Sequence, residues 1–305
     1  MGGWIQNTVV PYSTWDVVQE QLLYNDKLYI VGGDSNGGAL NKITAYDTTL
    51  DSYDQSLSSM SIPRYQCAGA ISGSTIFVFG GYRYDNYTQQ WDTLSVCEKY
   101  DILTDTWSSI NPMPHSKRSM SAARVENNIF VFGGVAGSDL PNAPSGMNTA
   151  IYKYNISTNT WTTQVQTYNA SSYAAVTVGN YIYLFGGYYY FNTVKKYDTI
   201  NDTLTTLPTT IPEYFTGGSG FARGTDIYLL GGYNNSKQFL KYDSVDSRWI
   251  TLPDMPSSKN GGAGGITEDG NIYIMEGSNS ANISYQLPSI PGPGDTNPHK
   301  TRISG

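Results

Sequence analysis

Short runs of apolar residues recur along the chain, and most of them end in a pair of glycines. The runs read LYIVGG, IFVFGG, IFVFGG, IYLFGG and IYLLGG, with first glycines at positions 32, 80, 133, 186 and 231. A sixth run, IYIMEG, has Glu276 in place of the first glycine. The spacing of 45 to 53 residues divides almost the whole chain into six similar units. A period of this length predicts a repeat architecture.

Each unit has the pattern of four short antiparallel strands. Polar turn signals such as YNDK, SGST and VGNY precede the apolar runs and predict a hairpin there. After each diglycine, or its Glu276 variant, a segment ends in a tyrosine, at positions 46, 100, 154, 197, 242 and 285. Seven residues later three units have a tryptophan (Trp107, Trp161 and Trp249), and two others have Tyr53 or Leu204. The pattern favours an all-β fold of four-stranded blades.

The diglycine, the tyrosine and the tryptophan seven residues on are the hallmarks of the kelch repeat. Over roughly residues 4–286 the chain resembles a six-bladed kelch β-propeller, and the resemblance implies four-stranded antiparallel blades. We assign residues 1–286 to this propeller. Residues 287–305, rich in proline and glycine, are predicted to be a tail or a linker, so the chain could be one module of a larger protein or assembly.

The last unit lacks a fourth strand of its own. The residues after Tyr285 contain four prolines and no tryptophan. Trp4 lies 28 residues before Gly32, close to the 26 and 25 residues that separate Trp107 and Trp161 from their next diglycines. We therefore predict that the segment WIQNTVV joins the final blade and closes the ring, which removes free sheet edges.

Charge and composition narrow the choice of partners. Charged residues make up 14% of the chain and the net charge is −7, so no basic surface for nucleic acid is expected. There is no run of 18 apolar residues, and we expect no membrane insertion. Low charge and six sequons favour an extracellular or surface-exposed glycoprotein, with a cytoplasmic location as the alternative. The candidate glycosylation sites are Asn86, Asn155, Asn169, Asn201, Asn234 and Asn282.

Signals for catalysis are sparse. The two histidines, His115 and His299, fall in a loop and in the tail, so we expect no histidine-based metal site, no Ser/His/Asp triad and no cofactor. A carboxylate pair stays open as an alternative, because several acids could converge on one face: Asp34, Asp85, Asp139, Glu213 and Glu276. Cys67 and Cys97 are predicted to lie two strands apart, roughly 9 to 10 Å, which is too far for a disulfide. We expect both to be buried.

One face of the predicted propeller carries the candidate binding residues. The loops after the diglycines and the entries to the innermost strands open there, and the resemblance to kelch adaptor proteins implies that this face binds peptides. The entries supply Trp15, Arg64, Lys117, Arg118, Tyr214, Phe215 and Lys259. The loops add Arg83, Tyr84, Trp91, Tyr189 and Tyr190. Aromatic and cationic side chains together could hold an acidic peptide or a sugar.

Three functions are compatible with these features. The preferred one is a non-catalytic binding or assembly module whose loop face engages a protein or glycan partner. A second is a carbohydrate-directed enzyme with arginine and carboxylate side chains at the channel mouth, as the resemblance to kelch-like sialate mutarotases implies. A third is a structural protein that coats a surface or a filament.

Overall fold

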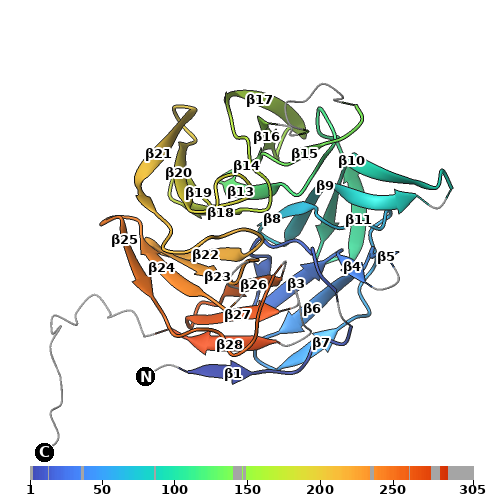
Figure 1. Cartoon of the computed structure of the whole chain (residues 1–305). Helices are drawn as coiled ribbons and strands as arrows, with labels where there is room; N and C mark the ends of the chain where they lie inside the picture. The colour runs from blue at the N-terminus through green and yellow to red at the C-terminus, as the bar shows by residue number, and fades with distance from the viewer. Residues whose placement is uncertain are drawn as a thin grey trace, which may run out of the picture.

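Each apolar run forms the second strand of a four-stranded antiparallel sheet, and six such sheets stand around a central axis in the computed structural model (Figure 1). The structure describes residues 3–12, 14–35, 38–85, 87–139, 146, 149–233, 237–260, 262–275 and 282–287. No α-helix occurs within these ranges. The prediction of a six-bladed all-β propeller is confirmed.

The blades follow one another in chain order, and within each blade the strands run from the innermost to the outermost. Blade 1 contains β2 (Leu23–Tyr24), β3 (Lys27–Val31), β6 (Ile43–Asp47) and β7 (Ser52–Asp54). Blade 2 contains β8 (Ala68–Ser72), β9 (Thr75–Asp85), β10 (Gln90–Asp101) and β11 (Thr106–Ile110). Blade 3 contains β13 (Ser121–Val125), β14 (Asn128–Phe132), β16 (Ala150–Asn155) and β17 (Thr160–Thr167).

The second half of the ring repeats this arrangement. Blade 4 contains β18 (Ala174–Val178), β19 (Tyr181–Phe185), β20 (Thr193–Asp198) and β21 (Thr203–Thr210). Blade 5 contains β22 (Ser219–Arg223), β23 (Asp226–Leu230), β24 (Phe239–Asp243) and β25 (Arg248–Thr251). Blade 6 contains β26 (Ala263–Ile266), β27 (Asn271–Met275), β28 (Ile283–Gln286) and β1 (Trp4–Gln6). Two short ribbons pair β4 (Asp34–Ser35) with β5 (Gly38–Ala39), and β12 (Lys117–Arg118) with β15 (Val135–Ala136).

Burial along a strand depends on its place in the blade. Five of the six second strands are buried at every position after the first, because neighbouring blades cover both of their faces. The longer strand β9 is buried from Ile76 to Gly81 and more exposed beyond. That two-sided burial explains their continuous apolar sequences. The outermost strand β21 instead alternates exposed and half-buried positions, and it is rich in threonine. Strand sequences therefore record how deep each strand lies in the ring.

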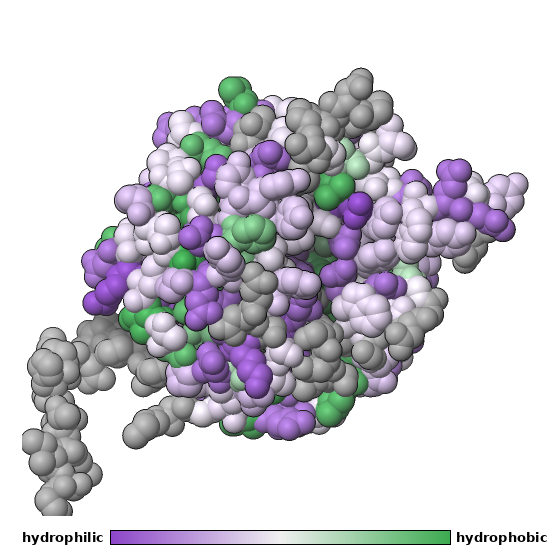
Figure 2. Space-filling model, in the orientation of Figure 1, coloured by the Kyte–Doolittle hydropathy of each residue, from purple (hydrophilic) through white to green (hydrophobic). Residues whose placement is uncertain are grey.

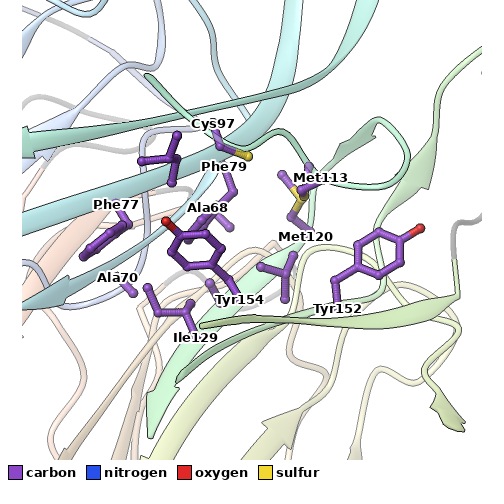
Figure 3. Packing of buried hydrophobic residues seen from close by; sticks show 13 residues of the cluster. Ala68, Ala70, Phe77, Phe79, Cys97, Met113, Met120, Ile129, Tyr152 and Tyr154 are labelled. Atoms are coloured by element: carbon purple, nitrogen blue, oxygen red, sulfur yellow. The ribbon is translucent and has the colours of Figure 1, made fainter. Parts of the chain in front are cut away.

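The tyrosine of each repeat packs against the apolar strand of the preceding blade. Between blades 2 and 3, the ring centroid of Tyr154 lies 5.9 Å from those of both Phe77 and Phe79 (Figure 3). The Trp161 ring lies 5.4 Å from that of Phe79. The same contact recurs at three other boundaries, through Tyr46, Tyr197 and Tyr242. The repeat-defining aromatic residues thus fill the wedges between blades, where each buries a large apolar surface.

Hydrogen bonds reinforce these boundaries on the outer rim. The indole N–H of Trp107 donates a hydrogen bond to the carbonyl oxygen of Ser58 in blade 1, at a distance of 2.6 Å. The Tyr100 hydroxyl donates to Asp105 at 2.7 Å, and the same carboxylate accepts the Ser58 main-chain N–H at 2.8 Å. Trp161 bonds to blade 2 in the same way. Each of these two blades is therefore fastened to the one before it by its own tryptophan.

The diglycines mark the points where the entry loop of the next blade approaches. Gly80 has φ +52°, and a Cβ placed on it would lie 2.6 Å from the carbonyl oxygen of Lys117. The N–H of the second glycine donates to the corresponding carbonyl at four other boundaries: Gly33 to Arg64, Gly134 to Ala170, Gly187 to Phe215 and Gly232 to Lys259. Only glycine combines this backbone conformation with so close an approach.

The N-terminal strand closes the ring, as the sequence predicted. β1 pairs with β28 in the register Trp4 with Tyr285, and the two strands lie together at the bottom of Figure 1. The Trp4 ring packs 5.2 Å from Phe239 of blade 5, and its indole N–H donates to the Pro253 carbonyl after that blade at 3.0 Å. Trp4 thus makes the contacts that the repeat tryptophans make elsewhere, although it comes from the other end of the chain.

Two glycines in blade 2 distinguish the cost of a left-handed backbone from the cost of a steric clash when a side chain is added. We expect Gly73→Ala, at φ +56° with no atom near the new Cβ, to cost about 1 kcal/mol of unfolding free energy. Gly80→Ala, at a similar φ, should cost about 3 kcal/mol or more, because the Cβ also collides with the Lys117 carbonyl. Urea denaturation measures both. Equal losses would show that crowding by the next blade is not what requires glycine.

Closure of the ring is tested on β1. Trp4→Ala should lower the free energy of unfolding by about 3 kcal/mol, because it removes a packed aromatic ring at the closing boundary. Ile5→Ala, on the exposed side of the same strand, should stay within about 0.5 kcal/mol of the parent. Thermal or urea unfolding of both variants gives the comparison, and a harmless Trp4→Ala would contradict the role given to this strand.

Candidate functional site

Three consecutive positions enter each innermost strand, and they point to three different places. The first position is fully or almost fully buried in every blade: Thr14, Arg64, Lys117, Ala170, Phe215 and Lys259. The second pairs with the residue after the diglycine of its own blade, as Trp15 does with Asp34 and Ser171 with Tyr188. The third has a positive φ and lies at the channel mouth: Asp16, Gln66, Ser119, Ser172 and Gly217.

Four of the residues predicted to face a partner at this mouth are buried instead. Arg64, Lys117, Lys259 and Phe215 occupy the first position, where the main-chain carbonyl rests on the preceding diglycine and the side chain turns inward between blades. Arg64 Nη2 pairs with Glu98 Oε2 at 2.5 Å. Lys117 Nζ donates to the Ala150 carbonyl and lies 4.2 Å from the Tyr152 ring centre, and burial lowers the pKa of this lysine. These side chains stabilise the ring and do not reach a partner.

The third positions form a chain of main-chain hydrogen bonds around the mouth. Gln66 N–H donates to Asp16 O at 2.9 Å, Ser119 to Gln66 at 2.9 Å, Ser172 to Ser119 at 3.0 Å and Gly217 to Ser172 at 2.7 Å. The left-handed backbone of these residues turns each N–H toward the neighbouring blade. Five blades are thereby tied at one rim, and the side chains at this position are held in fixed places around the channel.

Two side chains from blade 1 bond to the innermost strands of other blades. Glu20 Oε1 accepts hydrogen bonds from Ala122 N at 2.7 Å and Ser121 Oγ at 2.8 Å, and Oε2 accepts from Gly69 N at 3.2 Å. Gln21 exchanges two bonds of 3.2 Å with the main chain of Ile266. These side chains satisfy main-chain groups on the inner edges of three blades. Burial raises the pKa of Glu20 to about 7 despite its hydrogen bonds.

A pocket on the loop face lies beside the channel mouth, and we call it the mouth pocket. Its volume is about 370 Å³. Aromatic walls come from blades 4 and 5, where the exposed fractions of Tyr188 and Tyr233 are 54% and 74%. Asp16, Gln19 and Asn260 supply polar groups. A concave site with aromatic walls and a few convergent polar groups is typical of ligand binding.

The aromatic run after Gly187 divides differently from the prediction. Tyr189 is exposed as expected, but Tyr190 is half-buried, with its ring stacked 6.1 Å from Tyr168 and 4.8 Å from Lys195 Nζ. Tyr188 is exposed in its place. Strand alternation does not apply here, because Tyr189 has φ +80° and the chain turns at that residue. The exposed pair is therefore Tyr188 and Tyr189.

A second aromatic group, the hairpin cluster, stands on the long hairpin of β9 and β10, which projects at the right of Figures 1 and 2. Trp91 is 58% exposed and stacks on Tyr82, with ring centroids 5.2 Å apart and an interplanar angle of 12°. Tyr84 meets the edge of Trp91 at 5.2 Å, and the Arg118 guanidinium lies 4.2 Å from the Tyr82 ring centre. Tyr82 was not among the predicted contact residues; it lies diagonally across the hairpin from Trp91, whose direct partner in the register is Tyr84.

The remaining predicted contact residues are distributed around the same face. Arg83 is paired with Asp85 at 2.9 Å on the hairpin. Tyr214 is exposed beside Phe191, with ring centroids 5.6 Å apart, and so borders the mouth pocket. Trp15 is half-buried. Figure 2 shows apolar residues only in small separate groups on the face it displays.

The candidate carboxylates do not form one cluster in the described part of the chain. Asp34 lies near Asp16, Asp85 pairs with Arg83, and Asp139 bonds to Ser116 and faces His115 at 3.5 Å. Glu276 and His299 lie outside the described residues. Among the residues that are described, no group of three or more His, Cys, Asp or Glu side chains could hold a metal ion.

Cys67 and Cys97 are both buried and both free, as their strand positions predicted.

The described segments include no helix with the length and apolar character needed to cross a membrane.

The sequons differ in their accessibility. Asn201 is exposed in the turn between β20 and β21, and Asn155 and Asn169 are half-buried. Asn282 is fully buried next to β28, so the expectation of a glycan there is wrong for the folded protein. Asn86 and Asn234 lie outside the described residues.

Comparison with known proteins adds independent evidence on the fold. A family model described as the KLHDC2/KLHL20/DRC7 Kelch-repeats domain matches residues 20–232. Kelch-like protein terF of Aspergillus terreus is 30% identical over 166 residues, which cover 50% of this chain and 35% of that protein. Kelch-like protein 15 of Homo sapiens is 24% identical over 179 residues, which cover 54% of this chain and 28% of that protein. The chain thus matches about a third of the length of these relatives.

A solved structure described as "Structure of YjhT" has a TM-score of 0.72 and 15% sequence identity to this chain. The superposition covers 92% of this chain and 99% of the other. At this identity the likeness shows the fold alone.

The Glu20 carboxyl predicts how stability changes with pH. Because the pKa of Glu20 is raised, the folded protein binds the carboxyl proton more tightly than the unfolded chain, in which the pKa has its ordinary value of 4.5. The stability linked to the proton is therefore fully present below pH 4.5 and is lost as the pH rises toward 7. Between pH 5 and pH 8 we expect the parent to lose on the order of 2 kcal/mol more than Glu20→Gln. Urea denaturation at both pH values measures this difference, and identical pH profiles would contradict it.

Proposed function

Because this chain belongs to the kelch-repeat β-propeller family, we propose that it is a non-catalytic binding module that engages a protein partner through its loop face. Members of the kelch-like family generally bind protein partners. The matched relatives are much longer than this chain, so the functions of their other regions are not transferred to it. The proposal concerns the propeller and its loop face.

The observation that carries the proposal is the mouth pocket and its exposed aromatic walls. Tyr188 and Tyr233 project on one face without being covered by the described chain, and the pocket between them opens beside the channel mouth. Tyrosine offers a large rigid contact area with a polar tip, which suits recognition of a protein surface. The hairpin cluster, with exposed Trp91, extends the same face by a second aromatic group.

A glycan is the alternative ligand for the mouth pocket, because aromatic faces and amide or hydroxyl groups also suit a sugar ring. The enzymatic alternative required arginine and carboxylate side chains together at the mouth. Arg64 is buried in an ion pair, so that alternative has less support than the binding module.

Selection of binders from a displayed peptide library, with the folded propeller as the target, tests the proposal. Selected peptides should bind at least tenfold more weakly to Tyr188→Ala and to Tyr233→Ala, because each variant removes an aromatic wall. Tyr181→Ala is the matched control, since Tyr181 is a partly exposed tyrosine at the start of β19, on the opposite side of the ring. Isothermal titration calorimetry gives the affinities. Peptide binding that is insensitive to both wall variants, or a peptide library that yields no binder, would contradict the proposal.

A further inference from the structure

The charge at the channel mouth has the opposite sign from the one that the sequence suggested. The cations of the entry loops are withdrawn: Arg64 pairs with Glu98, and Lys117 and Lys259 are buried between blades. Arg118 lies over the Tyr82 ring and donates to Gln66 Oε1 at 3.3 Å. Among the residues that line the mouth pocket, the one ionisable side chain besides tyrosine is the carboxylate of Asp16.

Asp16 is positioned for a charged ligand. Its Oδ2 accepts a hydrogen bond from Gln66 Nε2 at 2.9 Å, which fixes the carboxylate in the wall of the pocket. In the described part of the chain no lysine or arginine nitrogen lies within 4.0 Å of it, so its charge has no ion-pair partner there. Asp34 lies close enough for its charge to act on Asp16. A half-buried carboxylate without a counter-ion, next to a second one, favours a cation in the pocket.

The aromatic walls fit the same ligand. Tyr188, Phe191 and Tyr233 line the pocket together with Asp16. The faces of aromatic rings attract lysine ammonium and arginine guanidinium groups, which are held most strongly where water is partly excluded. At about 370 Å³ the pocket is within the usual range of small-ligand sites, about 300 to 1,000 Å³. The net charge of −7 would also attract a cationic partner over a longer range.

We propose that the mouth pocket receives an arginine or lysine side chain of the protein partner, with the Asp16 carboxylate as its counter-ion and Tyr188 and Tyr233 as its aromatic walls. This inference rests on the proposed function and names the chemistry of the partner. Asn260 and Gln19 supply further polar groups around the cation, and the methylene stem of the side chain contacts the aromatic walls. The pocket therefore selects against the acidic peptides that a basic mouth would bind.

Four matched peptide libraries test the charge preference. Each has the form acetyl-XXXXZXXXX-amide, where X is a mixture of residues and Z is arginine, lysine, alanine or glutamate. We expect the arginine and lysine libraries to bind the 305-residue chain at least tenfold more tightly than the glutamate library, with alanine between them. Fluorescence polarisation of labelled libraries gives the comparison.

The Asp16→Asn variant isolates the counter-ion. Asparagine keeps the side-chain shape, can still accept the Gln66 hydrogen bond, and tolerates the φ of +56° at this position. The preference for the arginine and lysine libraries should fall at least tenfold in this variant. Asp246→Asn is the control, because it removes the same charge from an exposed turn between β24 and β25 on the opposite face, and it should leave the preference unchanged.

The outcomes separate this inference from the proposed function. Binding that depends on Tyr188 but shows no preference among the four libraries, or that prefers glutamate, would overturn the cationic partner and leave the binding module intact. An arginine preference that survives Asp16→Asn would also overturn the inference. Binding that is unaffected by both Tyr188→Ala and Tyr233→Ala would overturn the proposed function itself. A circular dichroism spectrum and melting temperature equal to the parent's establish that each variant is folded.

Discussion

The structure depends on one repeated contact, in which the carbonyl oxygen of an entry loop rests against the diglycine of the preceding blade. At Gly80 this oxygen belongs to Lys117 and leaves no room for a Cβ. At four other boundaries the second glycine also donates its N–H to it. The contact fixes where each blade begins relative to its neighbour. The aromatic wedges and the rim hydrogen bonds then complete a boundary whose spacing is already set.

The same contact determines which side chains a partner can reach. A residue whose carbonyl is docked on the diglycine must direct its side chain between blades, and this buries Arg64, Lys117 and Phe215. Two residues later, the left-handed backbone brings Asp16 and its counterparts to the channel mouth. The mouth pocket is therefore left with one carboxylate, polar side chains and aromatic rings. A rigid ring that presents such groups from several blades is suited to binding, because little ordering is needed when a ligand arrives.

Blade 1 differs from the others in the channel, where β2 has only two residues and Glu20 and Gln21 cross to other blades. Innermost strands leave main-chain groups unpaired along the channel, and side chains are one way to satisfy them. Glu20 accepts hydrogen bonds from the main-chain N–H groups of Gly69 and Ala122. Its carboxyl is desolvated there, which raises its pKa. Closure through β1 and bracing through Glu20 both involve the N-terminal part of the chain, so this part connects the first blade to the rest of the ring.

The sequence by itself determined the repeat, the number of blades, the inward role of the tyrosines and tryptophans and the closure by Trp4. These features depend on local patterns that recur in register, and each unit repeats the same packing problem. Tertiary structure decided which loop residues are exposed. A shift of two positions separates buried Arg64 from Gln66 at the mouth, and a turn at Tyr189 exchanges the exposure of Tyr188 and Tyr190. Such differences depend on contacts between blades, so no pattern within one repeat could predict the charge of the mouth pocket.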